Sequence, residues 1–164
     1  PTLTTSPEQT CVVCPVRGGV LSTFFEDVLR DGGLRCIQMT AESHDRTMAV
    51  VQGLTHFQAI AAAHCMETIG FNPQESWQFA SPVYRLRLAM IGRILAQNPR
   101  LYAEIQIFNP YVRDVLRALS RSQEALARFV EAKDVEGFVR EFERVRDSLG
   151  TFSKQALEET ARVL

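Results

Sequence analysis

Twenty consecutive residues without a formal charge, residues 47–66, constrain the fold of this chain more than any other feature. The run lies inside a helical pattern that begins after Thr40, a good N-cap residue, and stops at Gly70. A helix whose middle is apolar on almost every side must be covered on every side. Since 164 residues provide little material for such a cover, the pattern predicts a partner subunit that wraps the helix.

The same run is not expected to cross a membrane, because polar side chains interrupt it at Gln52, Thr55, His56, Gln58 and His64. The start of the sequence, PTLTTSPEQT, has neither the basic nor the apolar region of a signal peptide. A net charge of −1 and a pI near 6.4 give no reason to expect nucleic acid or an anionic membrane as a partner. We therefore expect a soluble, cytoplasmic protein.

The first 39 residues follow a strand–helix–strand pattern. We expect strands at residues 11–16 and 34–39, with a helix at residues 21–30 between them. The apolar residues of that helix, which share one side, are Phe24, Phe25, Val28 and Leu29. One such unit is too small to form a sheet of its own, so residues 1–39 are interpreted as the end of an incomplete α/β domain.

Residues 40–164 are helical throughout in their pattern. Further helix starts are marked by Asn72-Pro73, Ser81-Pro82, Asn98-Pro99, Asn109-Pro110 and Asp134. Apolar periodicity continues through Ala132, and a last helix is expected at residues 151–164. The predicted fold class is mainly α: an all-α domain at residues 40–164, preceded by a short β-α-β remnant.

An arginine falls on the apolar stripe of the helix expected to begin at Ser81. The stripe consists of Leu86, Ala89, Met90 and Ile94, with Arg93 near its middle and Arg85 and Arg87 on the flanks. A buried guanidinium needs an anion, and its planar fork suits a carboxylate held by two hydrogen bonds. The pattern leaves two readings open for Arg93: an internal Asp or Glu partner, or the carboxylate of a substrate.

No catalytic apparatus is recognisable in the chain. The Gly18-Gly19 turn lacks the third glycine and the following acidic residue of a dinucleotide site, so we expect no cofactor-binding and no catalytic residue here. The Cys11-x-x-Cys14 pair has no second pair at a spacing that suits a metal. We therefore predict reduced structural thiols at Cys11, Cys14, Cys36 and Cys65, and no metal site.

Three histidines remain as candidates for binding. His56 shares a helical face with Ala49, Gly53, Ile60 and Ala63, a small-residue groove that suits either close packing or a ligand. His44 stands beside Asp45 at a helix start, where capping explains the pair, and His64 is expected to be structural.

Three separated blocks resemble the C-terminal, dimerising and substrate-binding domain of bacterial prephenate dehydrogenases, a family often fused to chorismate mutase. The blocks are SPVYRLRLAMIGRILAQNPRLYAEI, HDRTMAVVQGLTHF and VRDSLGTFSKQALEETARVL, in the order and spacing of the family. The resemblance covers almost the whole chain. It implies that residues 1–39 end a Rossmann-like nucleotide-binding domain, and that the chain forms a homodimer.

The resemblance further implies an NAD-dependent oxidative decarboxylation of prephenate to 4-hydroxyphenylpyruvate, in tyrosine biosynthesis. The family's proton-accepting histidine and cofactor loop match no residue of this chain, so the chain alone is expected to be inactive and to bind no NAD. Arg93 matches the arginine that binds the substrate carboxylate, and His56 matches a histidine near the substrate that is linked to inhibition by tyrosine. His44 and Arg85 are further candidates for a substrate or regulatory role.

Two departures from the commoner family motifs occur, at Arg46 and Thr55. The resemblance is also compatible with a relative that acts on arogenate or 4-amino-4-deoxyprephenate. An alternative of another class is a stand-alone dimeric interaction or regulatory domain that binds an aromatic amino acid or its precursor.

Overall fold

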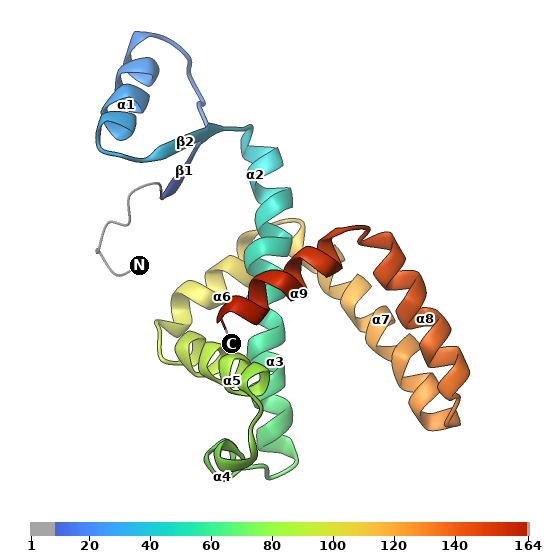
Figure 1. The fold of residues 1–164 in the computed structure, drawn as a ribbon. Helices are drawn as coiled ribbons and strands as arrows, with labels where there is room; N and C mark the ends of the chain where they lie inside the picture. Colours follow the sequence, from blue (N-terminus) through green and yellow to red (C-terminus); the bar gives the residue numbers. More distant parts are fainter. Residues whose placement is uncertain (1–8, 164) are drawn as a thin grey trace.

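A computed structural model describes residues 9–163 and consists mainly of helices, as predicted (Figure 1). In chain order the elements are β1 (Thr10–Val13), α1 (Val20–Asp31), β2 (Arg35–Gln38), α2 (Ala41–Met48), η1 (Ala49–Leu54), α3 (Thr55–Thr68), α4 (Pro73–Ser76), η2 (Trp77–Phe79), α5 (Pro82–Leu95), α6 (Pro99–Phe108), α7 (Val112–Ala132), α8 (Val135–Ser148) and α9 (Phe152–Val163). Most expected helix starts are confirmed, because the side chains of Asn72, Ser81, Asn98 and Asp134 each cap a helix N-terminus. The exception is α7, which begins at Val112, with Tyr111 as its N-cap residue.

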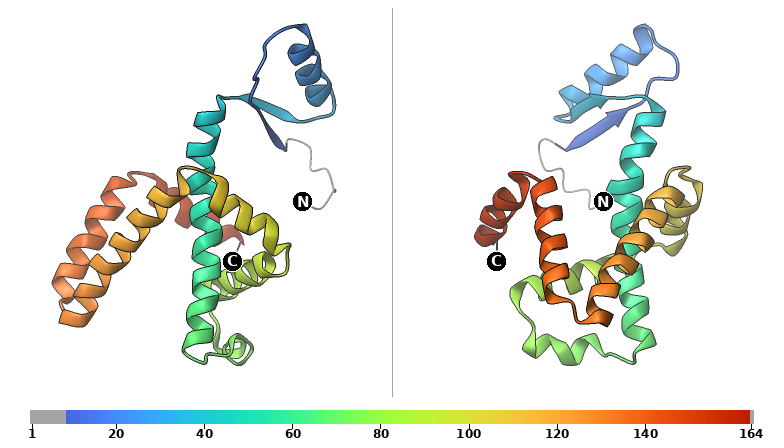
Figure 2. Two further views of the ribbon diagram at one scale, coloured as in Figure 1. Left: turned by 180° about the vertical axis from the view of Figure 1, so that it is seen from behind. Right: turned by 90° about the vertical axis from the view of Figure 1, so that its right-hand side faces the viewer.

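One long helix, formed by α2, η1 and α3, is the axis of the molecule (Figures 1 and 2). It starts where Thr40 accepts a hydrogen bond from the Ser43 amide at 3.0 Å, and it ends at Gly70, whose φ of +66° suits glycine. Its middle segment, η1, is a π-helix rather than the regular α-helix that the sequence predicts. None of the helices within residues 9–163 is both long and apolar enough to cross a membrane.

The remaining helices pack around this axis. Helix α5 packs against α3, while α6 and α7 pack against η1. Helices α7 and α8 form an antiparallel hairpin that projects from the axis, joined by Lys133 in a left-handed conformation and by the N-cap Asp134 (Figure 1). An edge-to-face contact between Phe129 and Phe138 closes the tip of this hairpin.

At one end of the long helix, β1, α1 and β2 form a small unit with two parallel strands (Figure 2). Strand β1 ends at Val13, three residues earlier than expected, since Pro15 donates no ladder hydrogen bond and restricts Cys14 before it. Helix α1 turns its polar side to the sheet: Glu26 is only 3 % exposed, whereas Phe24 and Phe25 are 58 % and 64 % exposed.

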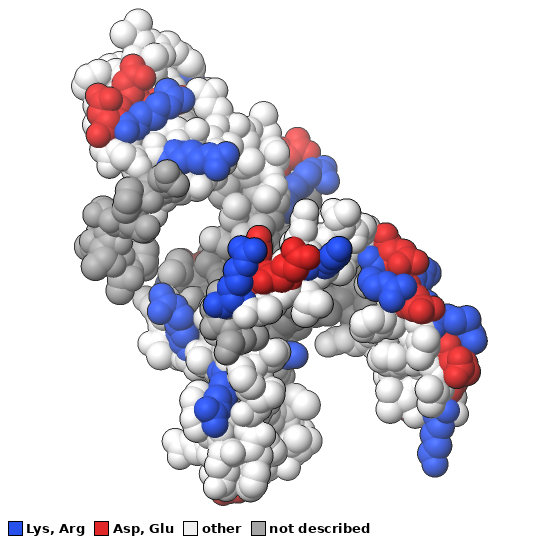
Figure 3. Space-filling model, in the orientation of Figure 1, with Lys and Arg blue, Asp and Glu red and all other residues white. Residues whose placement is uncertain are grey.

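The core of the described chain is very small. Its buried apolar residues are Ala49, Ile91, Ile94, Tyr102 and Val112, at the junctions of α5, α6 and α7 with the long helix. The chain exposes 13136 Å², whereas a compact monomer of 18.5 kDa would expose about 8,200 Å² by the size scaling of folded proteins. Much of the surface over the lower helices in Figure 3 is uncharged. Large apolar faces are therefore left without a cover in a single copy.

Candidate functional site

Helix α5 places Arg93 on an exposed face, not on the buried stripe that the sequence predicts. The residues that α5 buries are Ile91 and Ile94, and Tyr84 and Leu88 continue the same side. Leu86 and Met90, expected to be buried, are 47 % and 49 % exposed and share the face of Arg93. The prediction of burial was wrong because α5 has two apolar faces, and the long helix covers the other one.

Arg93 has no ion-pair partner within residues 9–163. In the described part of the chain, the hydrogen bond between Arg93 and another side chain involves its backbone carbonyl, which accepts from the Gln97 side-chain amide at 3.1 Å. An internal carboxylate was one of the two readings of this residue, and the described part of the chain supplies none. The guanidinium is thus available to an anion that comes from outside the chain.

Arg85, one turn into α5, is held by the segment before the helix. Its guanidinium donates a hydrogen bond to the backbone carbonyl of Trp77 at 3.3 Å and lies 5.6 Å from the centre of the indole ring. This arrangement fixes η2 against the start of α5. The geometry therefore gives Arg85 a structural task, which the sequence did not predict.

His56 lies at the start of α3, half-buried against α6. Its ring makes an edge-to-face contact with buried Tyr102, with the centroids 4.6 Å apart. Burial lowers the pKa of the imidazole below its ordinary value of 6.5, so the neutral form is favoured at neutral pH. The Nδ1 atom is shielded from solvent and has no hydrogen-bond partner within residues 9–163.

The small-residue groove beside His56 is filled by packing at Gly53, whereas Ile60 and Ala63 of the same face line two cavities. A Cβ atom on Gly53 would lie 2.6 Å from Cγ2 of Val112, so α7 approaches the long helix as closely as a glycine permits. Gln106 of α6 also reaches this groove, where its amide donates a hydrogen bond to the Gly53 carbonyl at 3.0 Å. At Gly53 the close-packing alternative is confirmed.

Sequence reasoning missed Gln106, whose Oε1 atom is buried and lacks a partner within residues 9–163. Gln106 lies one helical turn after Tyr102, so both side chains face the same part of the long helix. Its only sequence signal was a polar residue between Ile105 and Ile107 in an otherwise apolar helix turn.

His44 lies in α2, and its Nδ1 is 3.0 Å from the Asp45 carboxylate. The backbone carbonyl of Asp45 accepts a hydrogen bond from Asn109 at 2.8 Å, which ties α2 to the turn before α7. Arg46 strengthens the same junction: it pairs with Glu42 at 2.9 Å and stacks over the ring of Tyr111 at 4.4 Å. The Arg46 hydrogen bond lowers the pKa of the Glu42 carboxyl.

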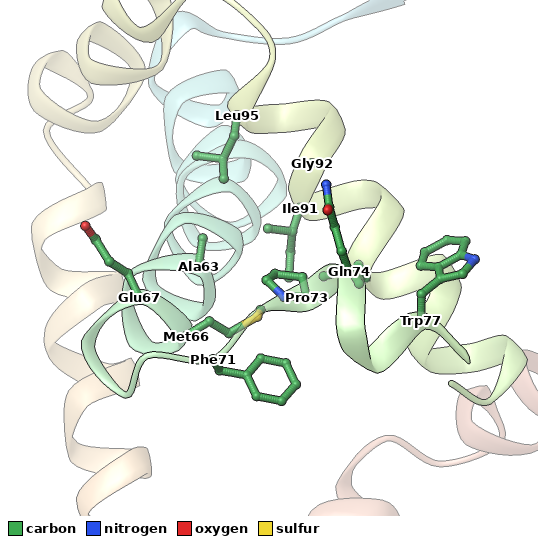
Figure 4. A pocket seen from close by; sticks show the side chains of 11 residues that line it. Ala63, Met66, Glu67, Phe71, Pro73, Gln74, Trp77, Ile91, Gly92 and Leu95 are labelled. Carbon is green, nitrogen blue, oxygen red and sulfur yellow. The ribbon is translucent and has the colours of Figure 1, made fainter. Parts of the chain in front are cut away.

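Two cavities lie beside α5. The larger, about 640 Å³, lies between α3, the α4–η2 segment and α5 (Figure 4). Its walls are almost wholly apolar and include Met66, Phe71, Trp77, Ile91 and Leu95. A second cavity of about 260 Å³ lies between α3, the end of α5 and α6, and is lined in part by Ile94, Tyr102 and Gln106. Apolar walls of this kind suit apolar side chains better than a dicarboxylate.

The four candidates do not converge in a single copy. Within residues 9–163, no hydrogen bond, ion pair or ring contact joins any two of His44, His56, Arg85 and Arg93. His44 and His56 stand on one continuous helix, and twelve residues of helix span about 18 Å at 1.5 Å per residue. Direct contacts within residues 9–163 therefore do not join these residues into one site.

The residues present do not fit a dinucleotide. The turn before α1 offers two glycines, and β2 ends at Gln38 and is followed by Met39, where a dinucleotide site places an acidic residue against the ribose. No group of three or more potential ligands that could hold a metal ion occurs among the described residues.

Comparison with known proteins supplies a family for these observations. Residues 40–144 match the prephenate dehydrogenase dimerization domain. The chain is 38 % identical over 127 residues to a probable arogenate/prephenate dehydrogenase of Methanocaldococcus jannaschii, a match that covers 77 % of this chain and 28 % of the relative.

Two further relatives carry related names. The T-protein of Haemophilus influenzae is 35 % identical over 132 residues, which are 80 % of this chain and 35 % of that protein. The 4-amino-4-deoxyprephenate dehydrogenase of Streptomyces pristinaespiralis is 30 % identical over 118 residues, which are 72 % of this chain and 40 % of that protein. The chain thus spans well under half the length of the relatives that it matches.

Proposed function

The chain belongs to the prephenate dehydrogenase family through its dimerization domain, and we propose that it is the dimerising, substrate-carboxylate-binding half of an NAD-dependent prephenate dehydrogenase. The whole enzyme would convert prephenate to 4-hydroxyphenylpyruvate by oxidative decarboxylation, in the cytoplasm. NAD and the proton-accepting histidine would be held outside residues 1–164, with residues 1–39 as the end of the nucleotide-binding domain. The exposed apolar face of α1 supports that last assignment, since Phe24 and Phe25 lack a cover.

The observation that carries the proposal is the free guanidinium of Arg93 on an apolar face. Leu86 and Met90 flank it on exposed α5, and the described residues offer it no carboxylate. When a second subunit covers this face, the guanidinium loses water and needs an anion. A substrate carboxylate meets that need with two parallel hydrogen bonds, which a fork-shaped donor provides and a point charge does not.

The test is kinetic, on the whole enzyme. We expect Arg93→Ala to raise the KM for prephenate steeply and to change kcat less, a loss of about 2–5 kcal/mol in kcat/KM. Arg93→Lys should restore little of it, because one ammonium group cannot replace the bidentate fork. Arg87→Ala is the matched control, since Arg87 is an exposed arginine of the same helix on another face.

Thermal stability of the same variants separates binding from folding. Because Arg93 makes no ion pair within the described chain, Arg93→Ala should not lower the melting temperature. A lowered melting temperature with unchanged KM would return Arg93 to a structural role. The regulatory-domain alternative makes a different prediction. It would be favoured if residues 1–164 bind prephenate or tyrosine and the whole protein oxidises neither prephenate nor arogenate.

A second candidate substrate is favoured by the names of the relatives. One is named for both arogenate and prephenate, and another for 4-amino-4-deoxyprephenate. Turnover of the three compounds by one enzyme preparation would rank them by kcat/KM. Tyrosine, which we propose as an inhibitor acting near His56, can be added to the same assay, and His56→Gln should weaken its inhibition.

A further inference from the structure

Cys11 and Cys36 stand directly opposite each other in the β1–β2 ladder. Both are free thiols, and both are half-buried. Neighbouring strands lie about 4.8 Å apart. This Cα separation falls inside the range of about 4.4–6.8 Å that disulfides span. The sequence predicted only reduced structural thiols here, because α1 separates the two cysteines and the register of the strands is not visible in the sequence.

The two thiols also share one face of the sheet. The thiol of Cys36 points to α1, where it donates a weak hydrogen bond to the backbone carbonyl of Glu26 at 3.9 Å. Gln38, two residues later on the same face, bonds to the Glu26 carboxylate. Side chains directly opposite in a ladder project to the same face, so Cys11 shares the face of Cys36, and its thiol contacts the Val12 carbonyl at 4.0 Å.

The Cys11-x-x-Cys14 motif cannot close while β1 is a strand. Three residues of extended chain separate the Cα atoms by about 10 Å at 3.3 Å per residue. That distance exceeds the span of a disulfide. Cys65 is exposed on α3, outside the strand–helix–strand unit. Within the described chain, Cys36 is thus the cysteine that stands in register with Cys11.

We infer that Cys11 and Cys36 form a reversible, oxidant-responsive disulfide. A hydroperoxide accepts attack by one thiolate, which gives a sulfenic acid and releases an alcohol or water. The second thiol then displaces the sulfenic hydroxyl as water and forms the S–S bond. The two sulfur atoms lose two electrons in total, and the peroxide O–O bond gains them as it breaks. A small thiol returns both cysteines to the reduced state by exchange.

The disulfide would close a loop of the chain that contains α1, and it would link β1 covalently to β2. Since the Met39 amide continues the ladder with a hydrogen bond to the Val13 carbonyl at 3.2 Å, the cross-linked strands lead directly into the long helix. The inference uses the ladder register alone and is independent of the proposed function.

The test is peptide mapping of the whole protein after mild oxidation. The protein is treated with hydrogen peroxide, alkylated and digested with trypsin, in a Cys14→Ser/Cys65→Ser background. We expect the peptide that ends at Arg17 to be joined to the peptide of residues 36–46, with the loss of two hydrogen atoms. Dithiothreitol should release both peptides.

Cys11→Ser and Cys36→Ser in the same background are the matched controls, and each should leave the other cysteine of the pair alkylatable, with no cross-link. The same linkage should form in the wild type, where Cys14 competes. Three results would overturn the inference: a Cys11–Cys14 bond in the wild type, separate oxidation of the two thiols to sulfinic acids, or a cross-link between two copies.

Discussion

At the scale of single residues, the imidazole of His56 owes its lowered pKa to burial alone. The folded protein therefore binds this proton less readily than the unfolded chain, whose histidine titrates near 6.5. Stability from this group is full above that pH, and it is lost as the pH falls toward the lower pKa of the folded state.

We therefore expect the melting temperature to fall as the pH is lowered from about 7.5 to about 5, and His56→Gln to flatten that fall. His64→Gln is the control, because His64 is an exposed histidine farther along α3 and should leave the dependence unchanged. Equal pH dependences for the wild type and His56→Gln would contradict the assignment.

The roles of individual residues could be predicted from the sequence only where they depend on near neighbours in the chain. The caps were predicted correctly because Thr40, Ser81 and Asp134 each accept a hydrogen bond from the backbone amide three residues later. The exposure of Arg93 was not predicted correctly, since helical periodicity identifies an apolar face but not the element that covers it. Gln106 and Tyr111 gain their roles from contacts with residues more than fifty positions away, which no local pattern contains. The site roles of Arg93, His56, His44 and Arg85 remain predictions.

At the scale of elements, η1 is the segment on which most of the packing depends. Helices α6 and α7 both contact it, and Gly53 within it receives Val112 from α7. π-Helical turns are frequently found at functional sites. The sequence could not reveal η1, because its residues AVVQGL are equally compatible with an α-helix.

Gly53→Ala should destabilise the protein by about 1–3 kcal/mol, because the new methyl group overlaps Val112. Without that overlap, alanine would stabilise a helix relative to glycine by about 0.5–1 kcal/mol, so even the sign of the change is informative. Denaturant unfolding of Gly53→Ala, Val112→Ala and the double variant completes the cycle. In the Val112→Ala background the added cost should nearly vanish; strict additivity would show that the two residues do not interact.

At the scale of the whole molecule, a single copy leaves too much apolar surface in water. Its surface exceeds that of a compact monomer by about 5,000 Å², which is more than the roughly 1,000–2,500 Å² that each partner of an obligate dimer buries. The uncharged run in the long helix indicated this from the sequence, because residues 47–66 need more cover than the chain contains. The mainly-α class was predictable for the same reason: long periodic segments carry the strongest signal.

We expect light scattering at low micromolar concentration to give twice 18.5 kDa for residues 1–164. Leu86→Glu should reduce that mass to a single copy, because it places a charge on the exposed apolar face of α5. Arg113→Glu on α7 is the control, since that position is already charged and lies in water. A monomeric wild type would refute the dimer, and a dimeric Leu86→Glu variant would exclude this face from the interface.

The strand–helix–strand unit of β1, α1 and β2 is connected to the long helix without a linker. The ladder runs as far as Met39, whose amide bonds to Val13, and Thr40 already caps α2, so no flexible linker intervenes. Any rotation of the strands against the axis must be taken up by the backbone dihedral angles of those two residues. The long helix then acts as a rigid lever, with Met39 and Thr40 as its hinge. A displacement of the strands would therefore reach the start of the long helix directly, because only Met39 and Thr40 lie between them.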